Sequence, residues 1–574
     1  MRPGSAVLKL PKRSVSHEGG EPIVKAAPGE AICNALIVQP RFHGGSFWAY
    51  KDSCQLVGAR YPAPSLGLIT VAAMLPESWD IRLIDRNVVE DEAAFDAVLD
   101  WSDLVLTGGM MAQQRDLFAV IDRAQARGVP VAVGGPDVSS SPHLYERADL
   151  RVLGEAEGCI DEFIAAWEAG QRKGTFAAPL YSVDVTRSPV PRFDLLDFSK
   201  YLEITVQFSR GCPFRCEFCD IIELYGRNPR TKTSAQMLAE LDRLYELGYR
   251  GTIEFSDDNL IGNKKAVKAF LPHLVAWQKE HGYPFDFVTE ASLNLADEQE
   301  LLDLLREANF FALFVGIESP DPDVLVMAQK KQNTRREIAG SVHKIQAVGI
   351  IVVAGFIIGF DNEKPGTARG LIDLIEDASI PISMISLLYA LPNTQLTKRL
   401  AKEGRLHADH DKIGDDRKTD QCTAGLNFDT LRPRHEVLGD FRTVVDHIYR
   451  PEAYFDRVRR TVDLLDCSGV NGALHPTTMG RELIFFARFL WNLTVRHPAV
   501  RGPVWRLVAD ILWRKPRALK AAVSMAGMYV HLGPFSRTVV AEIDRQIAEV
   551  LPAPAAFAEP DMRRAAAAHR AQLA

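Results

Sequence analysis

The 574-residue sequence has no uninterrupted apolar run of about 18 residues, the length that a membrane-spanning helix needs. Its first thirty residues are polar and contain no apolar secretion signal, so we expect a cytoplasmic protein. Only eight residues are cysteine, which argues against a disulfide framework and fits a reducing compartment. The net charge of −7 argues against a nucleic-acid partner. The rest of the composition, 47% hydrophobic and 25% charged, is that of a soluble globular protein.

What the sequence does contain is a succession of segments of different character. After an N-terminal extension over 1–30, residues 31–192 and residues 193–397 each alternate short β-rich runs with helical runs. Residues 398–574 are mostly helical by periodicity. Strands that alternate with helices predict α/β domains built on parallel sheets. We therefore expect two α/β domains followed by a helical C-terminal region.

In the first α/β segment, β-rich runs at 35–39, 81–85, 104–107, 129–134 and 150–153 predict a doubly wound parallel sheet. Ligands of such sheets bind at the carboxyl ends of the strands. Two glycine-rich loops occur there, and glycine lets the backbone approach a bulky ligand closely. Their candidate binding residues are Gly108, Gly109, Met110, Gly134, Gly135 and Pro136. No G-x-G-x-x-G nucleotide fingerprint follows the first strand.

The most specific motif is a group of three cysteines, Cys212, Cys216 and Cys219, in a C-x3-C-x2-C spacing after an apolar run at 204–208. Three thiolates on one short loop can bind three irons of a 4Fe-4S cubane and leave the fourth iron open. An open metal position is where a small molecule binds and reacts. The alternative is a zinc site, which needs a fourth ligand and usually a second C-x2-C or histidine pair. No such pair follows nearby.

The second α/β segment contains six βα units, which predict a partial (β/α)6 barrel, open on one side, with its chemistry at the carboxyl ends of the strands. The residues 257–259 at one such end are also typical of a helix cap. Glu318 ends an apolar strand and needs a partner such as a cationic amine or a hydroxyl. Arg210 and Arg215 flank the cysteines, where they either offset the charge of the thiolates or lie at the surface. The candidate residues at the strand ends are Ser256, Asp257, Asp258, Glu290, Ser292, Glu318, Ser319, Gly355, Ile357 and Gly359.

The helical C-terminal region has a basic and aromatic stretch over 481–537. It contains ten lysine or arginine residues against two acids, together with Trp491, Trp505 and Trp513. Basic residues beside tryptophan on helices can lie at a membrane surface. The other interpretation is a helical cap that packs its aromatic side chains on the mouth of the barrel and exposes a basic face. We favour the cap, and both roles can hold together.

The cysteine spacing, with Phe218 in the apolar position before its last cysteine, resembles the radical S-adenosylmethionine enzymes. A parallel-sheet domain directly before such a barrel resembles the cobalamin-dependent subclass, and residues 62–76 are similar to the start of its cobalamin-binding domain. The strings at 208–212, 289–292 and 316–320 look most like the subgroup that includes bacterial hopanoid methylases. The resemblance covers about residues 31 to 550.

This resemblance implies three cofactors: a 4Fe-4S cluster, S-adenosylmethionine and cobalamin. The three cysteines would hold the cluster, and Phe218 with the strand-end residues named above would contact S-adenosylmethionine. Pro64 and Leu66, with the two glycine-rich loops, would contact cobalamin. Many cobalamin domains have D-x-H-x-x-G after the first strand, but His43 lacks the surrounding Asp and Gly, so we expect a loop histidine there. Glu363 lies one position beyond the acid of the family pattern, which leaves its contact open.

The implied function is methylation of an unactivated carbon of a hydrophobic substrate, such as a hopanoid-type lipid, through a 5′-deoxyadenosyl radical and methylcobalamin. Side chains alone cannot open such a carbon, which has no acidic proton. An external electron donor such as a flavodoxin or ferredoxin would reduce the cluster, and a peripheral membrane contact at the inner face would deliver a lipid. The alternatives are a non-methylating enzyme of the same architecture, such as an oxidative cyclase, and a corrinoid-sensing or redox-sensing binding protein.

Overall fold

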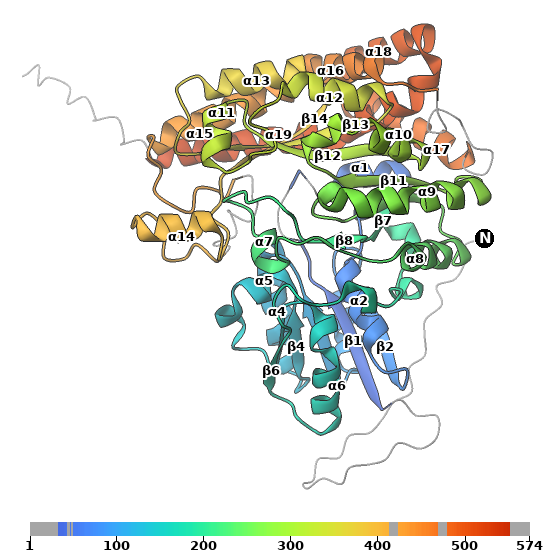
Figure 1. Ribbon diagram of the computed structural model, residues 1–574, viewed down its shortest axis with the longest axis vertical. Coiled ribbons are helices and arrows are strands. Elements are labelled where there is room, and N and C mark those ends of the chain that lie inside the picture. Colours follow the sequence, from blue (N-terminus) through green and yellow to red (C-terminus); the bar gives the residue numbers. More distant parts are fainter. Residues whose placement is uncertain (1–31, 43–45, 48–49, 413–422, 469–478, 551–574) are drawn as a thin grey trace, which may run out of the picture.

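The computed structural model describes residues 32–42, 46–47, 50–412, 423–468 and 479–550. Within these residues the chain forms two six-stranded parallel sheets and a group of helices that follows them. Figure 1 shows the first sheet in the lower half of the molecule and the second in the upper half. The predicted α/β class with parallel sheets and a helical C-terminal region is confirmed. The carboxyl ends of both sheets meet at the level where the two halves join, because residues from both sets of ends line one cavity there.

The first sheet has the strand order β2-β1-β3-β4-β5-β6. Its strands are β1 (Cys33–Gln39), β2 (Trp79–Asp85), β3 (Leu104–Gly108), β4 (Val131–Gly134), β5 (Leu150–Leu153) and β6 (Gly174–Ala177). Every neighbouring pair is parallel. The predicted strands are present, and β6 was not predicted because it is short and Phe176 is its one buried residue.

Each face of this sheet carries its own apolar core, since successive side chains of a strand point to opposite faces. Ala35 and Ile37 of β1 contribute to one core and Leu36 and Val38 contribute to the other. The first core is covered by α2 (Leu66–Met74) and α6 (Ile160–Glu168), and the second by α3 (Glu92–Leu99), α4 (Gln114–Gln125) and α5 (Pro136–Ser140). Helices therefore cover both faces, as a doubly wound sheet requires.

The second sheet has the strand order β14-β13-β12-β11-β10-β7, so each of its strands pairs with the next strand of this sheet along the chain. Its strands are β7 (Glu203–Val206), β10 (Gly251–Phe255), β11 (Phe285–Glu290), β12 (Phe310–Glu318), β13 (Ile351–Ile358) and β14 (Ile382–Leu387). All of these pairs are parallel. Strands β14 and β7 stand at the two edges and do not pair with each other, so the barrel is partial, as predicted.

Helices follow the strands of the partial barrel and cover its outer face. They are α8 (Ser234–Glu246), α9 (Lys264–Glu280), α10 (Gln299–Glu307), α11 (Pro322–Met327), α12 (Ile338–Ala347) and α13 (Thr367–Asp377). Thr233 and Gln236 form a reciprocal capping box at the start of α8, a sequence signature of a helix N-terminus. Between β7 and α8 lie β8 (Ser209–Arg210), α7 (Ile221–Leu224) and β9 (Arg230–Thr231), where β8 and β9 form a small antiparallel pair around the cysteine loop.

The C-terminal helices follow the partial barrel, and α15 and α19 lie along it. They are α14 (Gln395–Lys402), α15 (Arg434–Ile448), α16 (Pro451–Leu464), α17 (Met479–Trp491), α18 (Arg501–Arg514) and α19 (Leu519–Val550). Helix α15 packs against β14, and α19 packs against both α15 and α1 (Lys51–Val57). The Ser53 hydroxyl donates a hydrogen bond of 3.1 Å to the Gly527 carbonyl, which ties α1 to α19. Among the described residues, no helix is both long enough and apolar enough to cross a bilayer.

Candidate active site at the junction of the two sheets

The three cysteines lie on one loop that follows β7 and the short strand β8. The Cys212 amide donates to the Gly226 carbonyl at 3.2 Å, and the Cys219 amide donates to the Cys216 carbonyl at 3.2 Å. Gly211 has a φ of +97°, and an added Cβ there would lie 2.9 Å from the Gly226 oxygen. The loop therefore needs glycine immediately before its first cysteine.

The surroundings of the three thiols fit a cationic metal cluster. Cys216 is buried, and burial raises the pKa of all three thiols, so bare thiolates are disfavoured there. Iron supplies the positive charge that such buried thiolates need. No three His, Cys, Asp or Glu side chains converge on one point in the described residues. A cubane that takes one thiolate on each of three irons is compatible with thiols set apart in this way.

Two amide side chains point at these sulfurs. The Asn259 Nδ2 lies 3.8 Å from the Cys212 sulfur, and the Gln332 Nε2 lies 3.8 Å from the Cys216 sulfur. Donors to sulfur are among the features that set the reduction potential of a cluster. Asn259 also accepts the Ser292 amide at 3.1 Å, so the end of β11 is tied to the cysteine loop.

The adjacent acids Asp257 and Asp258 hold the backbone of this loop. Asp257 accepts the amides of Phe208 and Ser209 and the Ser209 hydroxyl, and Asp258 accepts the Gly211 amide at 3.1 Å. Burial raises the pKa of Asp257 to about 6 and that of Asp258 to about 7. These contacts differ from the helix cap considered above, because both acids accept backbone amides of residues 208–211, which directly precede Cys212.

Glu290, at the end of β11, faces open space between the two halves of the molecule. Burial, together with the nearby carboxyl groups of Glu254 and Asp258, raises its pKa to about 8. Its carboxyl group has no hydrogen-bond partner among the described residues, and it lines the junction cavity. A polar group that is half-buried and faces a cavity is suited to bind a ligand.

Glu318 ends β12 in a left-handed conformation with a φ of 71°, at a register shift between β12 and β13. Its carboxylate accepts a hydrogen bond of 2.7 Å from the Lys330 ammonium. Burial lowers the pKa of Lys330, but Glu318 and the thiols of Cys216 and Cys219 raise it more, so the net shift is upward. The partner that Glu318 needs is therefore supplied by the protein, and Lys330 places a positive charge beside the cysteines.

The ends of the later strands close the site from the other side. Gly355 lacks a Cβ where one would lie 2.7 Å from the Phe314 ring. The Gly359 amide donates to the Glu363 carboxylate at 2.9 Å, so Glu363 holds the turn after β13. Burial raises the pKa of Glu363 to about 7. Ser319 is buried and its hydroxyl accepts the Asp321 amide at 3.2 Å, while Ile357 stays half-buried on β13.

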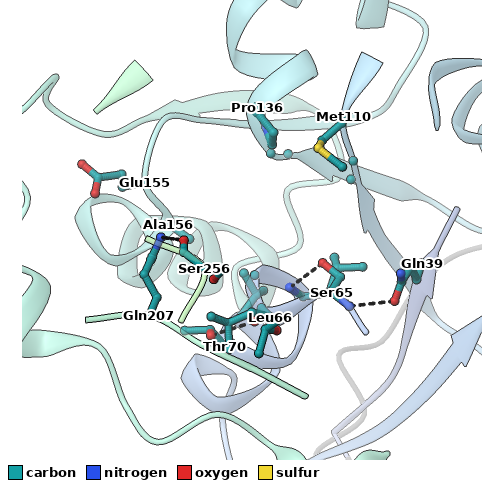
Figure 2. A pocket seen from close by; sticks show the side chains of 18 of the residues that line it. Gln39, Ser65, Leu66, Thr70, Met110, Pro136, Glu155, Ala156, Gln207 and Ser256 are labelled. Atoms are coloured by element: carbon teal, nitrogen blue, oxygen red, sulfur yellow. Dashed lines mark hydrogen bonds between the residues drawn. The ribbon is translucent and has the colours of Figure 1, made fainter. Parts of the chain in front are cut away.

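The glycine-rich ends of the first sheet line a cavity of about 710 Å³ that also reaches the second sheet. Figure 2 shows Met110 and Pro136 on one side of this cavity, with Gln207 and Ser256 of the barrel on another. All eight residues predicted to contact cobalamin lie in its wall: Pro64, Leu66, Gly108, Gly109, Met110, Gly134, Gly135 and Pro136. The sequence reasoning therefore selected residues that the fold brings together.

The two glycine-rich loops leave no room for side chains. A Cβ on Gly108 would lie 2.2 Å from the Gly134 oxygen, and a Cβ on Gly109 would lie 2.7 Å from the Gln113 Oε1. Gly135 has a φ of +94°. By contrast, the Met110 side chain is 51% exposed and points into the cavity. A smooth glycine floor with one flexible apolar side chain fits a large planar ligand that covers that side chain.

A buried ion-pair network joins the cysteine loop to the first sheet. The Arg210 guanidinium donates to Glu157 at 2.7 Å and to Glu155 at 3.1 Å, and Arg230 donates to Glu155 at 2.7 Å. Charge-assisted pairs of this geometry fix orientation as well as contributing energy. Arg210 therefore couples the two halves, whereas Arg215 is exposed.

Sequence reasoning missed Lys330, Asn259 as a contact of Cys212, and the acids Glu155 and Glu157. The Glu-Ala-Glu run that follows β5 was the available signal for the ion-pair network, but its basic partners lie more than fifty positions away. His43 lies outside the described residues.

A three-cysteine loop after the first strand of a six-stranded partial barrel defines the radical S-adenosylmethionine class of enzyme. Residues 206–375 match the Radical SAM superfamily, and residues 394–545 match a domain family of unknown function. An uncharacterized methyltransferase of Synechocystis sp. is 40% identical over 519 residues, which cover 90% of this chain and 94% of that protein. The hopanoid C-2 methylase of Rhodopseudomonas palustris is 38% identical over 487 residues, which cover 82% and 88%. The chain belongs to the cobalamin-dependent radical S-adenosylmethionine methyltransferases.

A solved structure agrees with this assignment in fold. The cobalamin-dependent S-adenosylmethionine radical enzyme OxsB, with aqua-cobalamin and S-adenosylmethionine bound, superimposes with a TM-score of 0.55 at 17% identity. The match covers 90% of this chain and 81% of that chain, so both sheets and the helical region take part. By its family match and its relatives the protein is a methyltransferase of the radical S-adenosylmethionine superfamily, and its fold is that of the cobalamin-binding enzyme OxsB.

Proposed function

We propose that this enzyme methylates an unactivated carbon of a hydrophobic, hopanoid-type lipid, with cobalamin in the 710 Å³ cavity. The observation that carries the proposal is that one cavity is bounded by the glycine loops of the first sheet and by Ser256 and Glu290 of the second. The residues for both kinds of cofactor therefore face each other across one space. When bound, these cofactors supply radical abstraction of hydrogen and transfer of a methyl group, chemistry that no side chain provides.

The side chains have supporting roles in this proposal. Cys212, Cys216 and Cys219 hold the cluster, and Asp257 and Asp258 fix the loop that carries them. Phe218, Ser256, Glu290, Ser292, Ser319, Gly355, Ile357 and Gly359 form the S-adenosylmethionine site, with Glu318 held by Lys330 at its edge. The network around Arg210 keeps the two cofactor sites in a fixed relation, which positions the reacting atoms.

The choice of a lipid is supported by the hopanoid C-2 methylase relative and by the surface of α17 and α18. Phe489 is buried and Phe485 lines a cavity inside the barrel, as a cap requires. Trp491, Trp505 and Trp513 are instead 59%, 46% and 90% exposed, beside several arginines. An exposed aromatic and basic surface is suited to a peripheral contact with an anionic membrane at the cytoplasmic face. An external one-electron donor, such as a flavodoxin or ferredoxin, completes the proposed set of partners.

The test is deletion of the gene, followed by mass spectrometry of lipid and pigment extracts. We expect loss of one methylated polycyclic lipid, restored by the wild-type gene and not by a gene with Cys216→Ala. Loss of a methylated pigment with unchanged lipids would contradict the lipid assignment. A lost product without a change of one methyl group would favour the non-methylating alternative, and no chemical change at all would favour a sensor.

A further inference from the structure

A second cavity of about 840 Å³ occupies the interior of the partial barrel. Its wall includes residues from β7, β10, β11, β12 and β13, and from α1 and α19. It shares Pro62, Ala63, Glu254 and Glu290 with the 710 Å³ cavity at the junction of the sheets, called the cofactor cavity below, so the two cavities meet inside the barrel. The interior of this barrel is thus a second space that opens onto the cofactor site.

The far end of this cavity lies at the N-terminal ends of the barrel strands. Gly282, which precedes β11, and Arg517, which precedes α19, are exposed residues in its wall. Lys520 lies beside them and forms an ion pair of 3.7 Å with Asp286. The carboxyl ends of the strands face the first sheet instead, so this mouth is at the opposite end of the barrel.

One face of α19 forms a side of the cavity. Ala521, Ser524 and Met528 are half-buried and recur at the three-to-four residue spacing that places side chains on one face of a helix. The small side chains at 521 and 524 keep the cavity wide near its mouth. An enlarged side chain at either position would narrow the passage without touching the cysteines or the glycine loops.

The inner wall is polar on one side and apolar on the other. Glu203 on β7 and Glu254 on β10 are diagonal neighbours on the lumen face, because Thr205 pairs with Glu254 and Thr252 pairs with Glu203. On the following strands, Val288, which pairs with Glu254, and then Phe314 and Val353 present half-buried apolar surface to the same lumen.

The two carboxyl groups lack protein partners. No side chain of the described residues forms an ion pair or a hydrogen bond with Glu203 or Glu254, and no basic group offsets them. Burial and the charge of Glu254 raise the pKa of Glu203, and burial raises that of Glu254. A carboxyl group accepts hydrogen bonds, and in its protonated form it also donates one. Polar groups that face a cavity without partners are costly unless a ligand satisfies them.

We propose that the substrate occupies this lumen cavity, enters at the mouth beside α19, and places a hydroxyl group on Glu203 and Glu254 with its apolar body against Phe314 and Val353. This inference rests on the proposed methylation of a hydrophobic molecule, and it adds the substrate class, an apolar alcohol, and the path by which it reaches the cofactors. Because the first sheet covers the carboxyl ends of the strands, the lumen is the approach that leaves the cofactor cavity undisturbed.

The experiment uses the full-length enzyme with cluster and cobalamin and a neutral dye, Nile red, whose emission shifts to the blue in an apolar cavity. Wild type, Ala521→Trp and the matched control Ala541→Trp are compared, since Ala541 is an exposed residue of the same helix. We expect at least a tenfold loss of dye affinity in Ala521→Trp and no change in the control. Equal dye binding by wild type and Ala521→Trp would overturn the lumen site, whatever the natural substrate is.

Displacement of the dye then tests the chemical class. A hopane-type triterpene alcohol and its parent hydrocarbon serve as competitors. We expect the alcohol to displace the dye from wild type at a concentration at least tenfold lower than the hydrocarbon. Glu254→Leu should remove this difference and Glu254→Gln should keep most of it, because an amide still forms hydrogen bonds. A preference for the alcohol that survives Glu254→Leu would overturn the role of the carboxyl pair.

The design separates this inference from the proposed function. If Ala521→Trp loses the dye but neither triterpene displaces it from wild type, the hopanoid-type assignment fails and the lumen site stands. Formation of 5′-deoxyadenosine without added lipid should be equal in wild type, Ala521→Trp and Ala541→Trp, which shows that the cofactors are in place. A parallel loss of 5′-deoxyadenosine in Ala521→Trp would contradict the inference, because it would place α19 at the cofactors rather than on the substrate path.

Discussion

The two parallel sheets both offer a binding surface at the carboxyl ends of their strands, but the two surfaces differ in composition. In the first sheet the surface that we propose to bind cobalamin lacks side chains, at Gly108, Gly109, Gly134 and Gly135. In the partial barrel it is made by adding charged and sulfur-containing side chains, such as Cys216 and Asp258. A large preformed cofactor needs shape, whereas a cluster and a charged cosubstrate need ligands and charge. The comparison shows that parallel strands ending at a common edge can present either a surface shaped for a large ligand or a surface that carries ligands and charge.

The largest effect is expected from Cys216→Ala, which removes a proposed cluster ligand from the partial barrel and leaves the first sheet unchanged. Iron content should fall to less than a tenth of the wild-type value, and 5′-deoxyadenosine should not form, because a cluster ligand is lost. Cobalamin binding, measured by its absorbance after gel filtration, should stay within about twofold of wild type. Loss of cobalamin together with iron would show that the two halves do not bind their cofactors separately.

The link between the halves is tested by Glu157→Gln. Burial alone would raise the pKa of Glu157, but the hydrogen bonds and charge of Arg210 lower it from its ordinary value of 4.5 to about 2. This lowered pKa stabilises the fold above pH 4.5, and the contribution is lost as the pH falls toward 2. At pH 7 the substitution should reduce the free energy of unfolding by on the order of 3 kcal/mol.

Urea unfolding of the cluster-free wild type and of Glu157→Gln, at pH 7 and at pH 3, measures the difference between their free energies of unfolding. The difference should be smaller at pH 3 than at pH 7, because at pH 3 the carboxyl group of Glu157 is protonated in the unfolded chain but still ionised in the folded protein. An equal difference at both pH values would show that Glu157 contributes packing rather than charge.

A glycine pair sharpens the shape argument for the first sheet. Gly108→Ala brings a Cβ to 2.2 Å from the Gly134 oxygen, so the strand ends must separate, at a cost of about 2 kcal/mol. Gly67→Ala, in the wall of the same cavity, meets nothing within 4 Å and serves as control. We expect cobalamin affinity to fall more than tenfold in the first variant and to change little in the second, by equilibrium dialysis. Equal cobalamin affinities of the two variants would contradict the claim that the cobalamin site needs glycine at position 108.

The smallest effect is expected from Met110→Ala. Covering the exposed half of this side chain with cobalamin should contribute about 1 kcal/mol, which is roughly a fivefold change in affinity. The stability of the cobalamin-free protein should change less than cobalamin affinity does, since half of the side chain is already exposed to solvent. If cobalamin binds Met110→Ala as tightly as wild type, the cofactor does not cover this part of the floor.

Local patterns in the sequence predicted most of the fold. The alternation of β-rich and helical runs identified all six barrel strands and five of the six strands of the first sheet, because buried parallel strands are short apolar runs. Strand β6 was not predicted, because it has one buried residue. Helix α1 was not predicted either, because it is held by contacts with α17 and α19, far along the chain.

For the site, sequence reasoning found residues whose type alone indicates chemistry, namely cysteines, strand-end acids and paired glycines. It could not find pairs that exist only in three dimensions. Lys330 gains its meaning from Glu318 and the cysteines, and Arg210 from two acids of the other sheet. Likewise Glu203 and Glu254 resemble ordinary polar residues of a strand until both are seen to face the lumen.

The central claim is that one cavity brings the radical chemistry of the barrel together with the cobalamin of the first sheet for methyl transfer. Anaerobic turnover with S-adenosylmethionine deuterated in its methyl group tests it, with 5′-deoxyadenosine, S-adenosylhomocysteine and product measured in one reaction. We predict that all three form in equal amounts, that the product carries the deuterated methyl group, and that enzyme without cobalamin forms no methylated product. Formation of 5′-deoxyadenosine and an altered product without S-adenosylhomocysteine would contradict the account.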